Sequence, residues 1–213
     1  MQIASAINRT KYDFFRWRYE LAIPKKLLLS IGIACLVGVL AQVRVYTPWT
    51  PVPITGQTFA ALIAGVVMGR KWGGISLAIY AALGIAGVPW FTPQAGMPLF
   101  SAGGISHLAG PTGGYIVGMI LAALFLGYFT DKYVKARRFP SMLGLMLFAS
   151  LAIIYIPGLI WLGVWLNLVS GTPTTIAAVI AMGAVPFIVG DILKSVMAAV
   201  TARAITPGED YRR

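Results

Sequence analysis

The chain has 213 residues, of which 58% are hydrophobic and only 11% charged, and its mean hydropathy is +0.81. A soluble domain carries about 25% charged residues, so this composition excludes an ordinary soluble protein and indicates an integral membrane protein. The net charge of +11 would suit a nucleic-acid surface, but the distribution of the charges indicates membrane topology instead.

The N-terminal segment, residues 1–24, mixes aromatic with basic side chains, and residues 14–18 read FFRWR. Such a mixture is typical of a helix that lies in the lipid headgroup region. A disordered tail is the alternative on the same composition. Because no apolar run precedes Leu27, we expect no cleavable signal peptide.

Six apolar stretches follow, separated by basic or Gly/Pro-rich segments. We expect membrane spans at about Leu27–Val43, Gly56–Met68, Gly73–Val88, Gly113–Phe129, Met142–Val169 and Phe187–Ala204. The sequence therefore predicts an all-α membrane protein of six helices, with a membrane domain at residues 25–205 and a short tail at 206–213. The second and third spans are short, which leaves tilted helices, a fused hairpin and a partly re-entrant pair as alternatives.

The basic residues set the expected orientation. If the N-terminus is placed in the cytoplasm, fifteen of the 17 Lys and Arg residues fall on the inner side, Arg44 falls outside and Lys194 lies within a span. This bias predicts a multi-pass protein of the cell membrane with both termini cytoplasmic. The basic excess is then a topology signal and a contact with anionic membrane lipid, and we expect no nucleic-acid partner.

The segment from Ser170 to Pro186 has two interpretations. It is either the first half of one long final helix or a separate short helix on the outer side. Gly183 and Pro186 favour the separate helix, because a proline disfavours helical backbone at its own position and at the one before. The last span then starts near Phe187.

The last span carries two ionisable residues, Asp191 and Lys194, three positions apart. Charge at membrane depth costs about 2.5–3.5 kcal/mol per residue on insertion scales, and it usually marks a substrate or ion path. The spacing puts both side chains on one helix face, where they can partner each other. A purely structural ion pair between packed helices is the alternative to ligand contact.

The predicted outer loops are long, whereas the inner connection Arg70–Trp72 is minimal. Arg44–Gln57 contains three prolines, and Val88–Tyr115 is rich in aromatic residues, proline and glycine. Long loops are usually functional or disordered, and the aromatic residues and prolines favour a packed lid. The asymmetry predicts that a ligand enters from outside.

The motif GPTGG (Gly110–Gly114) directly precedes the fourth span, and its Gly113 and Gly114 are followed by Tyr115. Free backbone N–H groups at a helix start attract anions, so this motif is a candidate seat for a substrate carboxylate or carbonyl. A tight turn into a transmembrane helix is the alternative.

His107 is the only histidine. One histidine makes neither a zinc site nor, alone, a catalytic system, and we expect no metal and no cofactor. The neighbouring Ser106 suggests an intramembrane hydrolase as an alternative, but no GxSxG motif surrounds it. We favour a loop histidine that lines the ligand site or bonds locally. Nothing in the chain resembles a nucleotide site, so any ATP-driven work must come from another subunit.

Four motifs together resemble the signature blocks of one family. They read VPITGQTFAALIAG (Val52–Gly65), YAALGIAGVPWF (Tyr80–Phe91), GPTGGYIVG (Gly110–Gly118) and PFIVGDILKSVMAA (Pro186–Ala199). These blocks resemble the BioY family, the biotin-binding S-components of energy-coupling factor (ECF) transporters. The resemblance covers about residues 27–204.

The resemblance implies a six-helix S-component that binds biotin from outside with high affinity. It implies work with an ECF coupling transmembrane subunit and two ATPase subunits, and therefore a transport subunit and not an enzyme. In this family the Asp and Lys of the last helix contact the vitamin, which matches Asp191 and Lys194. The glutamine after the PIT block is placed at the site, which matches Gln57 with Thr55 nearby. An S-component for another small vitamin is the near alternative.

Biotin also fits these residues chemically. Its ureido ring presents two N–H donors and a carbonyl, which complement Asp191, Gln57 and Lys194. Its thiophane ring and aliphatic chain suit an aromatic wall. The candidates for that wall are Trp90, Phe91 and Tyr80.

This chain departs from the family pattern in its outer loop. The segment Thr92–Ser101 is longer than expected, and an arginine expected near the biotin carboxylate is missing. The groups that could take its place are His107, Arg44, Lys194 and the amides of Gly113–Tyr115.

Ser30, Ala34 and Gly38 repeat every four residues along the first span. Small residues at this spacing let another helix approach closely. On spacing alone, internal packing and docking of a partner subunit both remain open. The resemblance implies docking on the coupling subunit.

Overall fold

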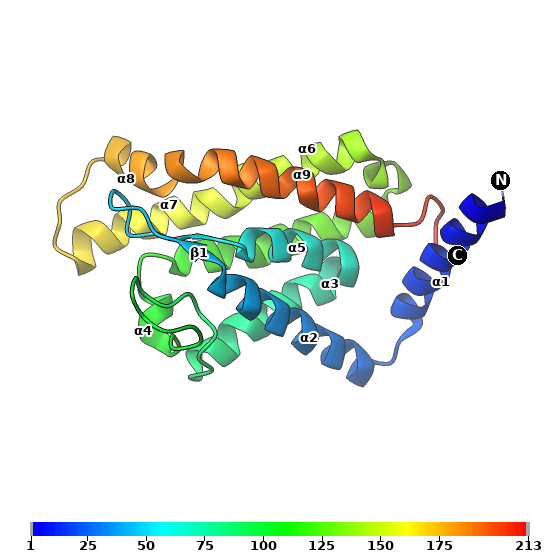
Figure 1. Ribbon diagram of the computed structural model, residues 1–213, viewed down its shortest axis with the longest axis horizontal. Helices are drawn as coiled ribbons and strands as arrows, with labels where there is room; N and C mark the ends of the chain where they lie inside the picture. The colour runs from blue at the N-terminus through cyan, green and yellow to red at the C-terminus, as the bar shows by residue number, and fades with distance from the viewer. Residues whose placement is uncertain (1, 212–213) are drawn as a thin grey trace.

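A computed structural model describes residues 2–211 of the chain, and their side chains from Asn8 onward. Arg212 and Arg213, counted above on the inner side, lie outside the described residues. The chain forms a bundle of long helices with one small β-hairpin (Figure 1). Its main elements are α1 (Gln2–Glu20), α2 (Ile23–Gln42), β1 (Arg44–Val45), β2 (Ile54–Thr55), α3 (Gln57–Ile85), α4 (Ile105–Leu108), α5 (Gly113–Lys132), α6 (Phe139–Phe148), α7 (Tyr155–Val164), α8 (Ile176–Gly183) and α9 (Ile188–Ile205).

Helix α3 is a hairpin and not one straight helix. Gly69 leaves the helical region with φ 77° and ψ −179°, a conformation that only glycine adopts readily. Beyond this turn, a Cβ on Gly73 would lie 2.8 Å from the Cα of Gly65, so the two arms pack backbone to backbone. The fused-hairpin alternative is therefore confirmed. The described residues hold five segments long and apolar enough to span a membrane, and the reversal in α3 makes six passes.

The fifth pass runs without interruption from Phe139 to Val169. Its α-helical geometry widens into π turns at Ala149–Ile154 and again at Trp165–Val169. Pro157 has no N–H to donate to the carbonyl of Ile153, and such a gap in the ladder favours a local π turn. The first of these π turns thus lies just before Tyr155.

The final pass is broken where Pro186 predicts. The backbone leaves the helix at Ala184 (φ −125°, ψ −55°), passes through a 3-10 turn at Val185–Phe187, and resumes as α9 at Ile188. Helix α8 is therefore a separate short helix, as predicted. Figure 1 shows that it lies end to end with α9.

The two long loops pack at one end of the bundle. Strands β1 and β2 pair antiparallel within the first loop. Gln42, at the end of α2, fastens the second loop: its Nε2 donates to the Trp90 carbonyl at 3.1 Å and its Oε1 accepts from the Phe100 amide at 2.9 Å. Trp90 and Phe91 are buried. The loop is thus a packed lid, as predicted.

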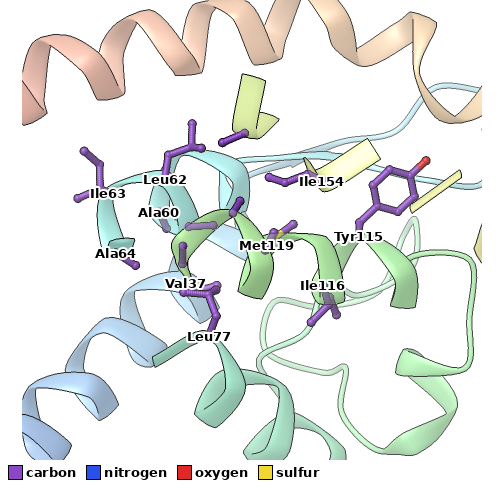
Figure 2. Close-up of a cluster of buried hydrophobic side chains, with 14 of the residues drawn as sticks. Val37, Ala60, Leu62, Ile63, Ala64, Leu77, Tyr115, Ile116, Met119 and Ile154 are labelled. Carbon is purple, nitrogen blue, oxygen red and sulfur yellow. The ribbon is translucent and has the colours of Figure 1, made fainter. Parts of the chain in front are cut away.

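The hydrophobic core lies between α2, α3 and α5, with α7 along one side (Figure 2). Figure 2 shows Val37 and Leu77 at the lower edge of the drawn cluster, and Met119 and Ile154 where α5 faces the fifth pass. Close approach is possible because glycines lie at the contacts. A Cβ on Gly65, for example, would come within 2.5 Å of the Ala123 carbonyl oxygen.

The small-residue stripe of α2 faces this core. Ser30 and Ala34 are fully buried, and Gly38 packs against the Trp90 side chain, where an added Cβ would lie 3.0 Å from the Trp90 Cβ. The stripe is therefore covered by the chain itself and offers no open face to a partner subunit. Of the two alternatives left open by the spacing, the structure corresponds to internal packing.

The opposite end of the molecule brings three distant segments together. The buried Arg18 of α1 donates through Nη2 to Asp131 Oδ1 at 2.9 Å and to the Tyr211 hydroxyl at 2.8 Å, and through Nη1 to the Val67 carbonyl at 2.8 Å. Tyr211 also donates to Asp131 Oδ1 at 2.6 Å. The end of α1 and the C-terminal segment are thus tied to the turn of α3 and the end of α5.

The α3 turn yields a stability prediction. Gly69→Ala is expected to lower the free energy of unfolding by about 1–3 kcal/mol, because a side chain there is strained by the positive φ. An added Cβ would also lie 2.4 Å from Asp131 Oδ2. Gly32→Ala is the matched control, since nothing lies within 4 Å of a Cβ at that position. Thermal unfolding in detergent measures both variants, and equal melting temperatures would contradict the assigned role of Gly69.

Candidate functional site

A cavity opens at the loop end of the bundle, between α3, α5, the fifth pass and α9. It has an empty volume of about 640 Å³, part of which is open to solvent. Eight of the predicted site residues line it: Thr55, Gln57, Tyr80, Phe91, His107, Tyr115, Asp191 and Lys194.

Asp191 and Lys194 form one polar wall of the cavity. Lys194 Nζ lies 2.8 Å from Asp191 Oδ1, and the Tyr155 hydroxyl donates to Asp191 Oδ2 at 2.7 Å. The Asp191 side chain is 6% exposed and that of Lys194 is 18% exposed. Each carboxylate oxygen therefore has one protein donor and keeps a lone pair for a further donor in the cavity.

The helix geometry explains why this pair is tolerated. Because the final pass breaks at Pro186, α9 begins at Ile188 and Asp191 lies in its first turn. Free N–H groups and the helix dipole favour a carboxylate there. Tyr155 reaches the same carboxylate from the fifth pass, directly after the π turn.

Gln57 organises the facing wall. Its Nε2 donates to the Tyr80 hydroxyl at 2.7 Å, and its Oε1 accepts from the hydroxyls of Thr55 at 3.1 Å and Thr92 at 3.2 Å. The start of α3, its second arm and both loops each contribute one of these groups. Gln57 is 6% exposed, so the network fixes its orientation at the cavity surface.

An apolar surface joins the two polar walls. Phe91 and Tyr80 meet edge to face, with ring centroids 5.4 Å apart, and Met119, Ile154 and Phe187 complete the lining. Trp90, predicted for this surface, does not line the cavity. Its indole donates to the Tyr80 carbonyl at 3.0 Å and its ring packs behind that tyrosine, so its place is in the support of the wall.

His107 lies at the mouth of the cavity. It lines both this cavity and a wider vestibule formed by the outer loops, so it stands between the two. Its ring stacks on Phe91 with centroids 6.2 Å apart. Its Nδ1 is buried and has no hydrogen-bond partner among the described residues. The imidazole is therefore held against Phe91, and its Nδ1 remains available for a hydrogen bond.

Tyr46 fixes the vestibule wall, with its hydroxyl donating to the Pro93 carbonyl. Burial raises the pKa of the Tyr46 phenol, and the nearby Arg44 acts in the opposite direction. Arg44 itself lines neither space, and its Nη2 donates to the Met97 carbonyl at 2.7 Å. Arg44 was one candidate for binding a ligand carboxylate, but its side chain lies outside both the cavity and the vestibule.

Gly113 and Gly114 lie at a helix contact and not at the cavity surface. A Cβ on Gly113 would come within 1.9 Å of the Leu108 carbonyl oxygen, and one on Gly114 within 2.3 Å of that of Pro157. The amide of Gly113 donates to Gly110 at 3.3 Å. The geometry corresponds to the tight-turn alternative, and only Tyr115 of this motif lines the cavity.

The main residue missed by sequence reasoning is Tyr155. It lies in an apolar span beside a proline, where nothing in the local pattern distinguishes it from core packing. Thr92 and Thr112 were also missed, and both line the cavity and the vestibule. The one available signal for Tyr155 was that Asp191, buried in a membrane helix, needs a donor besides Lys194.

The hydrolase alternative finds no catalytic arrangement in the described residues. Ser106 lines the vestibule and not the cavity. His107 Nδ1 lacks the third group that would orient a catalytic histidine.

The comparisons with known proteins agree with this architecture. The family model described as the BioY family matches residues 10–209. A "Probable biotin transporter BioY" from Methanothermobacter thermautotrophicus is 50% identical over 149 residues, covering 70% of this chain and 90% of that protein. The "Biotin transporter BioY" of Thermotoga maritima is 34% identical over 176 residues, covering 82% and 92%.

A solved structure also resembles the fold. The crystal structure of the S-component for biotin from an ECF-type ABC transporter matches with a TM-score of 0.72 and 24% identity, covering 86% of this chain and 93% of that one. At this identity the match supports the fold alone. Together with the family model and the relatives, it leads to one conclusion: this chain is a multi-pass membrane protein that belongs to the BioY family.

Proposed function

We propose that this chain binds biotin in the cavity and serves in its uptake. The observation that carries the proposal is the joint placement of Asp191, Lys194 and Gln57 on one cavity, reached through a vestibule at the loop end. Family membership and relatives named as biotin transporters support biotin as the vitamin.

The two polar walls suit the ureido ring of biotin. The free lone pairs of the Asp191 carboxylate can accept its N–H groups, and Lys194, with three donors, can serve its carbonyl. The thiophane ring would lie against Phe91 and Met119, where apolar area is available. A site built this way discriminates against analogues that leave its buried polar groups unpaired.

His107 is the group we propose for the biotin carboxylate. Arg44 lines neither cavity nor vestibule, the Gly113 amide is used within its turn, and Lys194 is engaged with Asp191. His107 lies at the mouth, where the end of the valerate chain would emerge, and its Nδ1 has no hydrogen-bond partner among the described residues. A histidine N–H is a suitable donor to a carboxylate.

We further propose that the protein lies in the cell membrane with both termini cytoplasmic, so that the vestibule faces outward. The Lys and Arg distribution supports this orientation. Transport then requires an ECF coupling transmembrane subunit and two ATPase subunits. The structural neighbour is an S-component from an ECF-type ABC transporter, which supports work with such a module. The chain itself would bind and not catalyse.

The central prediction concerns Asp191. Asp191→Asn is expected to weaken biotin binding by about tenfold or more, equivalent to about 1.4 kcal/mol, because the amide replaces an acceptor with a donor facing the ureido N–H groups. Isothermal titration calorimetry on the purified full chain measures this. The matched control is Asp13→Asn, the same change at an exposed carboxylate on α1. Unchanged affinity in the Asp191 variant would refute the site, and stronger binding of riboflavin or thiamine would refute the choice of vitamin.

A second prediction separates the two ends of the ligand. The wild-type chain is expected to prefer biotin over biotinamide, in which the carboxylate is neutralised, by about tenfold. His107→Gln should reduce this preference towards equality, whereas Asp191→Asn should weaken both ligands and leave the ratio unchanged. Competition binding with the two ligands gives the ratio. A His107 variant that keeps the full preference would assign the carboxylate to another group.

A further inference from the structure

A second concave site lies at the opposite end of the molecule from the cavity. It forms where the end of α1, the start of α2, the turn of α3 and the end of α5 meet, and its empty volume is about 1300 Å³. Nothing in the proposed biotin chemistry uses it. We call it the basal pocket.

The basal pocket is strongly basic. Among the described residues that line it are five basic side chains, against a single carboxylate, Asp131. That carboxylate is already occupied: it accepts from Arg18 and Tyr211 through Oδ1, and from the backbone N–H of Arg70 at 3.0 Å through Oδ2. Asp131 therefore balances Arg18, and the described lining of the pocket keeps an excess of positive charge.

Aromatic rings lie against three of these cations, Lys26, Arg70 and Lys132. The Arg70 guanidinium lies 5.0 Å from the centroid of the Tyr128 ring, and Lys132 Nζ lies at the same distance from it and donates to the Tyr128 hydroxyl at 2.7 Å. Lys26 Nζ donates to the Tyr19 carbonyl at 2.8 Å. In the described part of the chain, neither Arg70 nor Lys71 forms an ion pair. Positioned cations without anions are a phosphate-binding arrangement.

We propose that the basal pocket binds the phosphate of an anionic membrane lipid, with Arg70 and Lys71 as its principal contacts. The shared chemistry is that of a phosphate group, and the surroundings favour a lipid as its source. Trp72 and Tyr128 line the pocket, as expected of aromatic side chains at headgroup depth. Directly after Lys26, Leu27 and Leu28 are 44% and 69% exposed, so an apolar surface for acyl chains adjoins the charged one.

A bound lipid would help to hold α1 against the turn of α3. The pocket is shared between α1 and the α3 turn, whose contact depends on Arg18. A phosphate held there would screen the repulsion between Arg70 and Lys71 and stabilise this end of the bundle at the membrane surface.

The experiment titrates the purified full chain with lipid in neutral detergent and counts bound molecules by native mass spectrometry. Dioleoylphosphatidylglycerol is compared with dioleoylphosphatidylcholine, and inorganic phosphate is added as competitor. The test variant is the double substitution Arg70→Gln/Lys71→Gln. The matched control is Lys135→Gln/Arg203→Gln, which removes one Lys and one Arg, both exposed and outside the pocket.

We expect the wild-type chain to hold phosphatidylglycerol about tenfold more tightly than phosphatidylcholine. The pocket variant should lose about tenfold in affinity for phosphatidylglycerol, and the control less than about twofold. Equal losses in the two variants would reduce the effect to general surface charge and overturn the proposal. So would equal binding of the two lipids, or displacement of phosphatidylglycerol by millimolar inorganic phosphate, which would make the pocket a free-anion site.

Biotin binding provides an independent control of folding. Both double variants are expected to bind biotin as the wild-type chain does, because the pocket lies at the other end of the bundle. If biotin is not bound by any form while the lipid preference holds, the proposed function fails and the lipid site stands.

Discussion

The structure depends on supplying hydrogen-bond donors to one carboxylate that is buried in an apolar helix bundle. Asp191 can remain there because Lys194 on its own helix and Tyr155 on the fifth pass each donate to one of its oxygens. Without such partners a buried charge is strongly unfavourable. Two departures from regular α-helix bring these donors to the carboxylate. The break at Pro186 puts Asp191 in the first turn of α9, and the π turn at Ala149–Ile154 directly precedes Tyr155.

The cavity wall that faces Asp191 is formed largely by the two loops, which side chains at helix ends hold by hydrogen bonds. Gln42 binds the second loop through the Trp90 carbonyl and the Phe100 amide, and Gln57 gathers hydroxyls from both loops and from Tyr80. Two buried amide side chains thus hold the two long loops in a fixed surface. One wall of the site is therefore formed by membrane-spanning helices, whose backbone hydrogen bonds the bilayer requires. The other wall is formed by loops that side-chain hydrogen bonds hold in place.

The sequence allowed the passes to be placed because a bilayer requires apolar runs of fixed length, and the break before the last span follows from Pro186. Asp191 and Lys194 could be predicted because charged residues are rare in such runs, whereas Gln57 followed from the resemblance to the BioY family. Tyr155 could not, since its role depends on which helix faces Asp191. Nor could spacing alone show whether Ser30, Ala34 and Gly38 pack inside the chain or against a partner subunit. The same spacing of small residues serves both kinds of contact.

The core beneath the cavity limits how a ligand could leave it. Along α3 and α5, Leu62, Val66 and Leu126 lie deeper in the bundle than the residues that line the site, and all three are fully buried. Close packing at this level leaves no continuous aqueous route from one end of the bundle to the other. A molecule admitted at the loop end cannot simply diffuse through. Delivery across the bilayer would therefore require that the whole bundle reorient or that its helices separate.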